Sequence, residues 1–268
     1  MKQRLRFIVM VSVMAFNILA CQIAGIPISG TEIRGSGNVV EENREVRGIS
    51  GVELATTGTL HIEIGERESL RIEAEDNLLE YIETRVRAKT LVIDIPNDAN
   101  LRPTRPINYY LSVTDLDTIE IYSSGDIEAP DLEAERFSVA ISSSGDLRMG
   151  DLIADTLIVD ISSSGDMMMG TLHAKTLRVD INSSGNLDIA GGEVEKQDIT
   201  ISSSGDYTAR DLESDEAEVR ISSNGSATIR VSDYLEANLS SSGDLYYIGS
   251  PTMDVRTSSS GDVRRISE

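Results

Sequence analysis

The chain has 268 residues, with 45 acidic against 24 basic side chains and a formal net charge of −21. Such acidity disfavours binding to nucleic acid and to anionic lipid headgroups. The single cysteine excludes an intrachain disulfide bond.

Residues 1–20 have the pattern of an export signal. Basic residues in the first six positions precede an apolar run that is too short to span a bilayer stably. The run ends in Ile-Leu-Ala before Cys21, which resembles the cleavage box of bacterial lipoproteins. The sequence therefore predicts a lipoprotein signal peptide, lipidation of Cys21 and a tether over 21–36. We expect an exported envelope protein, held at the outer membrane by its lipid and facing the periplasm or the cell surface; secretion with an incidental cysteine is the alternative.

Residues 37–120 carry strand patterns without a fixed period. Gly37 and Gly58 are interpreted as degenerate corners of the repeat that follows. Asp76 precedes the one convincing helical turn, which its side chain is placed to cap. We expect this region to be an antiparallel or irregular β segment that covers one end of a coil, because an uncovered β edge invites association.

Residues 121–268 repeat a corner with the sequence Ser-Ser-Ser-Gly-Asp. Its glycines are separated by five steps of 20 residues and then two of 18; they are Gly125, Gly145, Gly165, Gly185, Gly205, Gly225, Gly243 and Gly261. Self-similarity at such a period indicates a stacked repeat architecture. Apolar and polar residues alternate between corners, so Val139, Val159 and Val179 are predicted to form one inward column, at about 4.8 Å per rung.

These patterns predict an all-β protein: a right-handed parallel β-helix with rungs of about 20 residues and an irregular β cap at its N-terminal end. Twenty residues suffice for one turn of a three-sided coil. A left-handed hexapeptide coil would show a six-residue sub-repeat, and a propeller would need about twice the period. We expect one domain over 37–268. Arg264 and Arg265 follow the last corner, where charge would discourage end-to-end stacking.

The corner motif has a structural and a metal-binding interpretation. In the structural one, glycine supplies a positive φ and the next residue, usually Asp, bonds its own backbone across the turn. The alternative is a calcium-binding structural coil that uses the column Asp126, Asp146, Asp166, Asp206, Asp244 and Asp262. Calcium-binding β-rolls have a nonapeptide spacing that this chain lacks. We therefore favour turn chemistry and expect no metal and no cofactor.

Catalytic chemistry has little support in the sequence. His61 and His173 stand in separate segments, without a recognisable nucleophile signature or metal cluster. By register Met167 and Met169 point inward and only Met168 points outward, which argues against a copper site. Polysaccharide-cleaving β-helices carry long loops and aromatic platforms, whereas these rungs are nearly loop-free and Trp is absent. We expect no enzyme, with a polysaccharide-acting β-helix enzyme as the alternative.

Three stretches resemble the GIN-domain family, whose name describes an autotransporter adhesin head. They are Gly-Ser-Gly-Asn-Val-Val at 35–40, Asp-Asn-Leu-Leu-Glu-Tyr-Ile-Glu at 76–83, and the Ser-Gly-Asp corners. The resemblance covers nearly all of the mature chain. It implies an exported bacterial β-helical protein, often a lipoprotein, and it brings no catalytic residues.

We therefore expect a non-catalytic envelope lipoprotein that acts as an adhesin or a surface-contact scaffold. A row of outward residues, Ala140, Asp160, Asp180, Thr200 and Arg220, offers a flat face for a partner. The expected partner is a protein or glycan surface ligand, besides the membrane reached through the lipid, and no nucleic acid. The sequence leaves the oligomeric state open.

Overall fold

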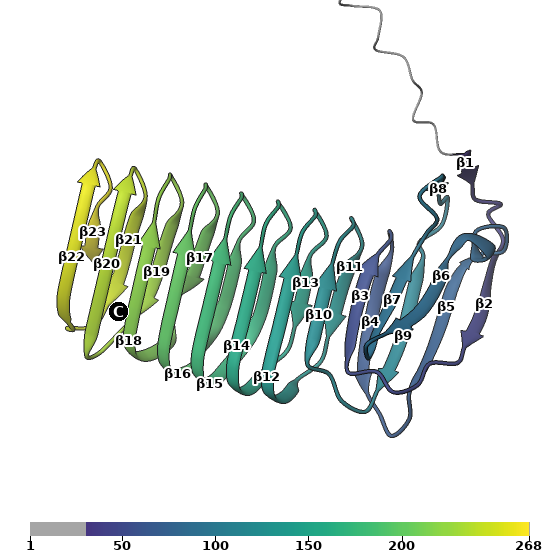
Figure 1. Ribbon diagram of the computed structural model, residues 1–268, viewed down its shortest axis with the longest axis horizontal. Coiled ribbons are helices and arrows are strands. Elements are labelled where there is room, and N and C mark those ends of the chain that lie inside the picture. Colours follow the sequence, from purple (N-terminus) through teal and green to yellow (C-terminus); the bar gives the residue numbers. More distant parts are fainter. Residues whose placement is uncertain (1–30, 268) are drawn as a thin grey trace, which may run out of the picture.

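The computed structural model describes residues 31–267, so Cys21 and the predicted signal peptide lie outside it. The strands stack along one axis into a long parallel β-solenoid that ends in an irregular β cap (Figure 1). The predicted all-β coil with an N-terminal cap is confirmed. Among the described residues there is no α-helix, and no helix is long and apolar enough to cross a membrane.

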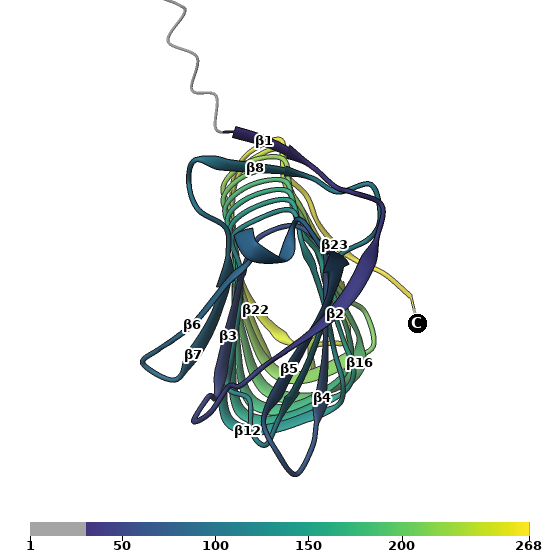
Figure 2. The same cartoon turned by 90° about the vertical axis from the view of Figure 1, so that its right-hand side faces the viewer.

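One rung has four parts, which we name from the stretch between 136 and 154. The first wall is 136–141, the corner is 142–146, the second wall is 147–149 and the base is 152–154. Each strand part pairs in parallel with its equivalent 20 residues on. Viewed along the axis, the two walls face each other, with the corner and the base at opposite ends (Figure 2).

The regular strands span the whole repetitive region. They are β10 (Thr118–Ile121), β11 (Asp126–Ala129), β12 (Leu132–Ile141), β13 (Leu147–Met149), β14 (Leu152–Ile161), β15 (Met167–Ile181), β16 (Leu187–Ile201), β17 (Asp206–Ala209), β18 (Leu212–Ile221), β19 (Ser226–Arg230), β20 (Tyr234–Ser241), β21 (Asp244–Ile248), β22 (Thr252–Ser259) and β23 (Val263–Arg265). In the last two rungs, where the period is 18, β20 first pairs with β18 at Glu216, so the base strand of β18 has no successor.

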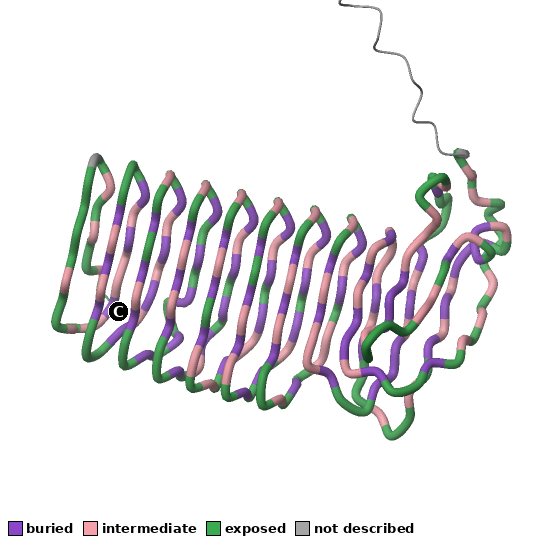
Figure 3. The backbone as a smooth tube through the Cα atoms, in the orientation of Figure 1, coloured by how far each residue is buried: buried purple, intermediate pink, exposed green. Residues whose placement is uncertain are grey.

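The core is a set of apolar columns between the walls. Val139, Val159 and Val179 stack in register and are at most 1% exposed, whereas Asp160 and Asp180 of the same strands point outward. Buried and accessible residues alternate along the wall strands (Figure 3). Burying such side chains stabilises the fold by about 1.5–3 kcal/mol each. The predicted inward column is confirmed.

The methionine triplet follows the same alternation. Met167 and Met169 are buried in the core, and Met168 is 39% exposed on the second wall. The inward orientation predicted for the two flanking thioethers is confirmed.

The corner glycines are required for a reason other than the one predicted. Positive φ angles occur at Gly37, Gly58 and three further glycines, and at none of the eight repeated corners. A Cβ on Gly165 would instead lie 2.2 Å from the carbonyl oxygen of Gly145, and one on Gly185 would lie 2.3 Å from that of Gly165. Each corner therefore packs its backbone on the backbone of the previous corner, where no Cβ fits.

The cap contains the remaining strands and one short helix. They are β1 (Thr31–Arg34), β2 (Val39–Arg44), β3 (Gly51–Ala55), β4 (Thr59–Ile64), β5 (Ser69–Glu75), the 3-10 helix η1 (Leu79–Tyr81), β6 (Glu83–Arg87), β7 (Thr90–Asp94), β8 (Ala99–Arg102) and β9 (Asn108–Val113). β3 and β4 form a complete rung that pairs in parallel with β10 and β11 on one side and with β7 and β9 on the other. Antiparallel β2, β5 and β6 then close this end. The order of rungs in space thus departs from the order in the chain.

Two details of the cap differ from expectation, and one agrees. Gly58 is a true corner, since its carbonyl accepts a hydrogen bond from the Asp126 amide at 2.9 Å. Gly37 is not a corner, because it leads into β2, which is antiparallel to β5. Asp76 does not cap η1, because the N-cap residue Leu78 has no side-chain hydrogen bond. The Asp76 carboxylate instead accepts hydrogen bonds from the side chains of Ser36 and Asn38.

A buried carboxylate joins the parts of the cap. Glu75 is 0% exposed and accepts hydrogen bonds from the Gly37 amide and from the amide and hydroxyl of Thr104. Burial alone would raise the pKa of Glu75, but the hydrogen bonds from Thr104, Gly37 and Arg105 together outweigh it, and the pKa lies below its usual value. The charged form therefore stabilises the contact between the end of β5 and the segments around β1 and β8.

Replacing a corner glycine tests the backbone contact. Gly165→Ala should lower the free energy of unfolding by about 1–3 kcal/mol, because the added methyl group overpacks against the Gly145 carbonyl. Ser164→Ala, one residue away and exposed, should change it by no more than about 0.5 kcal/mol. Chemical denaturation followed by circular dichroism measures both, and equal stability of the two variants would contradict the contact.

Candidate functional site

The corner aspartates form a ladder along the axis. The Asp146 amide donates to Asp126 Oδ1 at 2.9 Å, and the Asp166 amide donates to Asp146 Oδ1 at 3.0 Å. Asn186 continues the ladder, since its Oδ1 accepts from the Asp206 amide at 3.0 Å. The predicted bond of each Asp to its own turn is thus wrong: the side chain reaches the next rung.

In the rest of the ladder each aspartate also accepts from the amide of the next rung, and the one interruption is at Ser226, which has no carboxylate. Asp206 accepts from both the amide and the hydroxyl of Ser226, and Asp244 accepts from the Asp262 amide at 3.0 Å. Within residues 31–267, no three His, Cys, Asp or Glu side chains gather into a group that could hold a metal ion. The geometry favours a structural use of these carboxylates.

His61 belongs to a stack on the second wall near the cap. Its Nδ1 lies 2.9 Å from Glu128 Oε2, and its ring stacks on Tyr110 with 5.1 Å between centroids. The guanidinium of Arg71 covers Tyr110, with Cζ 4.0 Å from the ring centroid. These four side chains come from adjacent strands β11, β4, β9 and β5. The imidazole is therefore engaged by an aromatic ring and a carboxylate.

The outward row predicted on the first wall is present and longer than expected. Ala140, Asp160, Asp180, Thr200 and Arg220 are register partners on successive rungs. Asn238 and Arg256 extend the row at the C-terminal end, and Glu120 and Glu53 extend it toward the cap. Glu53 is 67 positions from Glu120 in the chain, so only the cap topology places it here.

Charge is distributed unevenly along this row. The pKa of Asp160 is raised, first by its loss of water contact and then by the neighbouring Asp180, although Arg178 acts in the opposite direction. The pKa of Glu120 is raised for the same two reasons, with Glu53 as the neighbour. The cap half of the row is therefore acidic, whereas the far half presents two arginines.

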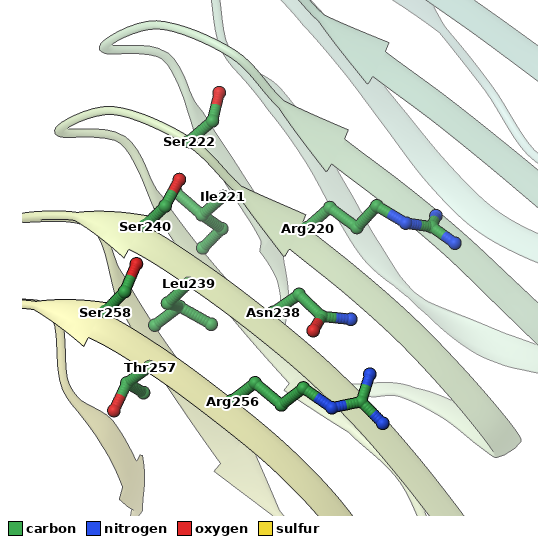
Figure 4. Close-up of a pocket in the computed structure, with 9 residues that line it drawn as sticks. All are labelled: Arg220, Ile221, Ser222, Asn238, Leu239, Ser240, Arg256, Thr257 and Ser258. Carbon is green, nitrogen blue, oxygen red and sulfur yellow. The ribbon is translucent and has the colours of Figure 1, made fainter.

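A groove of about 370 Å³ lies at the arginine end of the row (Figure 4). Arg220, Asn238 and Arg256 form one side, on β18, β20 and β22. The other side consists of the serines where each strand enters its corner, Ser222, Ser240 and Ser258, and Thr257 lines the groove from the column of Ile221 and Leu239. Equivalent groups on neighbouring rungs recur at about 4.8 Å.

Carboxylates on the next outward row hold both arginines. Arg220 Nη1 lies 3.1 Å from Asp198, and its Nη2 contacts Glu218. Arg256 Nη2 lies 2.7 Å from Asp254 and its Nη1 lies 3.5 Å from Glu236. A guanidinium has five N–H donors, and both side chains remain well exposed, at 46% and 65%. The groove thus offers oriented donors beside acceptors.

Sequence reasoning found one of the three residues that form the arginine side of this groove. The period placed Arg220 in the outward row, but Asn238 and Arg256 were missed because the period shortens to 18 after Gly225. Counting from each corner glycine would have found them, since Arg220, Asn238 and Arg256 all stand five residues before one.

Comparisons with known proteins bear on family and fold. A sequence model of the family described as "putative auto-transporter adhesin, head GIN domain" matches residues 49–171 and 151–251. No curated protein matches the chain.

Solved structures resemble the chain over most of its length. A protein from Parabacteroides distasonis described as a putative lipid binding protein has a TM-score of 0.83 at 22% identity, covering 88% of this chain and 100% of its own. A putative adhesin from Parabacteroides merdae has a TM-score of 0.81 at 16% identity, covering 88% and 99%. A second Parabacteroides distasonis protein, also described as a putative adhesin, has a TM-score of 0.73 at 16% identity, covering 88% and 100%. At these identities the likeness shows a shared fold.

The aspartate ladder can be separated from a calcium site by substitution. Asp166→Ala should lower the free energy of unfolding by about 1–3 kcal/mol, because the Asn186 amide loses its acceptor. Asp166→Asn should retain most of the stability, since Asn186 already fills the equivalent place one rung on. Thermal melting with and without millimolar Ca²⁺ provides the second readout. A melting temperature that rises with Ca²⁺ and loses this rise in Asp166→Asn would contradict the structural role.

Proposed function

The chain belongs to the family described as "putative auto-transporter adhesin, head GIN domain", and from this premise we propose that it is a non-catalytic surface-contact protein of the bacterial envelope. Its ligand is a hydroxyl-rich glycan that lies along the first wall. The observation that carries the proposal is the groove in which Arg220, Asn238 and Arg256 repeat at rung spacing opposite a column of hydroxyl groups.

The mixture of donors and acceptors favours this ligand class. A sugar hydroxyl both donates and accepts hydrogen bonds, so it can satisfy a guanidinium and a carboxylate that stand side by side. Arg220 and Arg256 each lie between two carboxylates. The net charge of −21 repels a polyanion at longer range. A neutral polysaccharide therefore fits better than a sulfated or phosphorylated one.

The shape of the surface supports contact over catalysis. The walls are flat parallel sheets whose outward rows repeat from rung to rung, which suits an extended polymer. His61, which pairs with Glu128 and stacks on Tyr110, lies on the second wall near the cap, away from the groove. The interior is occupied by buried Leu, Ile, Val and Met columns, so a lipid chain is not the ligand proposed for this protein.

The proposed location rests on the sequence of the first 21 residues. An export signal followed by Cys21 supports a lipid anchor at the envelope. In that arrangement the residues between Cys21 and β1 lead into the cap, since 31–34 of the predicted tether already form β1, and the solenoid extends beyond it. Mass spectrometry of the protein from its native host should find a diacylglyceryl cysteine at the N-terminus. Intact Met1, or an unlipidated N-terminus beyond Cys21, would refute the anchor.

Substitution of the two groove arginines tests the binding site. Arg220→Ala with Arg256→Ala should weaken binding to neutral cell-surface polysaccharides at least about tenfold, because two sets of charge-assisted hydrogen bonds are lost. The matched control is Arg148→Ala with Arg264→Ala on the second wall, which should leave binding unchanged. Binding is measured with purified polysaccharides, host cells, sibling cells and envelope fractions.

Three results would overturn the proposal. One is wild-type protein that binds none of these samples. Another is binding that protease treatment of the cells abolishes, which identifies a protein ligand. The last is an increase of reducing ends in the polysaccharide, which shows cleavage.

A further inference from the structure

The solenoid ends in an open rung formed by β22 and β23. Among the described residues none covers its outer edge. Met253 and Val255 occupy the inward positions of this rung, yet they are 38% and 39% exposed. Their register partners one rung earlier, Leu235 and Ala237, are 0% exposed. The last rung therefore presents core side chains that lack a next layer.

The backbone of β22 also has an unpaired side. The Thr252 amide donates to the Asp233 carbonyl on the rung behind. Successive residues of an extended strand point their N–H and C=O groups to opposite edges, so those of Met253, Val255 and Thr257 face outward from the open end. Such a row of unpaired groups is a template for another strand.

The other end of the solenoid has the antiparallel strands β2 and β6 at its edge, each paired on one side, and it has no open rung within the described residues. There β2 and η1 lie over the cap, and Leu79 and Ile82 are only 7% and 2% exposed. Head-to-tail stacking, which would give fibres, thus lacks a second open rung. Two open ends can instead meet in a closed, isologous contact.

We propose that β22 pairs antiparallel with β22 of a second copy, about a two-fold axis that passes through Val255. In this register Val255 faces its own counterpart, and Met253 faces the counterpart of Thr257. Asp254 then faces the counterpart of Arg256, and the same pair recurs across the axis. Positions 254 and 256 form the non-hydrogen-bonded pairs, in which side chains approach most closely.

Charge selects this register over its neighbours. An axis through Asp254 would place two carboxylates opposite each other, and one through Arg256 would place two guanidinium groups opposite each other. An axis midway between two residues would place an inward residue of one strand opposite an outward residue of the other, so the two faces of the sheet would not match. In the isolated chain Asp254 and Arg256 pair with each other at 2.7 Å. Dimerisation therefore exchanges two contacts within strands, one in each copy, for two between strands.

The charges on the other wall are the two arginines after the last corner. Arg264 is paired with Asp262, and Arg265 donates to the Ser250 hydroxyl at 2.8 Å. Of the two arginines that the sequence suggested would discourage stacking, Arg264 is thus paired with a carboxylate, and Arg265 keeps its charge at the end of the coil. A dimer built in this way brings two copies of the groove close to the two-fold axis, because each groove includes Arg256.

Sedimentation equilibrium tests the dimer with the chain from residue 22 onward, which contains every described residue. Over about 1–100 μM the mass should rise from one chain toward two. Asp254→Arg alone and Arg256→Asp alone should each raise the dissociation constant at least about tenfold, because each creates two like-charge pairs across the axis. The combined exchange should restore the wild-type constant. Glu218→Arg, on an interior rung, is the control and should leave it unchanged.

Val255→Pro separates dimerisation from folding. Proline removes an N–H that faces the open edge and leaves the pairing with β20 intact, so the melting temperature should stay near that of the wild type while the dimer is lost. A chain that remains monomeric across the concentration series overturns the proposal. So does a dimer that persists in both single charge reversals, or one that the combined exchange fails to restore.

Discussion

Successive corners touch through main-chain atoms, and the geometry of the whole solenoid depends on that contact. The Gly145 carbonyl oxygen lies 2.2 Å from the position that a Cβ of Gly165 would take, and similar close approaches repeat from corner to corner. Because backbone meets backbone at one fixed point of each turn, the rungs cannot slip along the wall. All other columns inherit their register from this point, including the buried valines and the outward row of the first wall.

The same stacking explains how an acidic protein uses its charge. The corner aspartates serve as acceptors for the amides of the next rung, so part of the negative charge satisfies the backbone. On the first wall, stacking places like charges together near the cap, and at the far end it places two arginines beside the carboxylates of the neighbouring row. The pKa of Asp160 is raised by its loss of water contact and then by the adjoining Asp180. A periodic fold thus places equivalent residues of a sequence repeat in straight rows of charged and polar side chains.

The two ends of the coil differ in whether other residues cover the last rung. At one end an antiparallel cap, joined through buried Glu75, covers the first rungs. At the other end the last rung leaves core residues and amides accessible. A parallel solenoid has edges at both ends by construction, and this chain covers one and leaves the other open within the described residues. The proposed ligand contact along the wall and the proposed self-association at the end both use this architecture, and Arg256 takes part in each.

The repeat in the sequence determined the fold class, the inward columns and the alternation at Met167–Met169, because period-2 patterning and a fixed period constrain which face is buried. The wrong predictions concern the corner, where a pentapeptide is compatible with either a positive φ or a close backbone approach. Only stacked rungs show that Gly165 meets Gly145 and that Asp146 reaches forward to Asp166. The tertiary structure alone decided that Gly58 is a corner and Gly37 is not, and that Glu53 joins Glu120. These relations connect segments far apart in the chain, and they depend on pairing across rungs that local sequence does not encode.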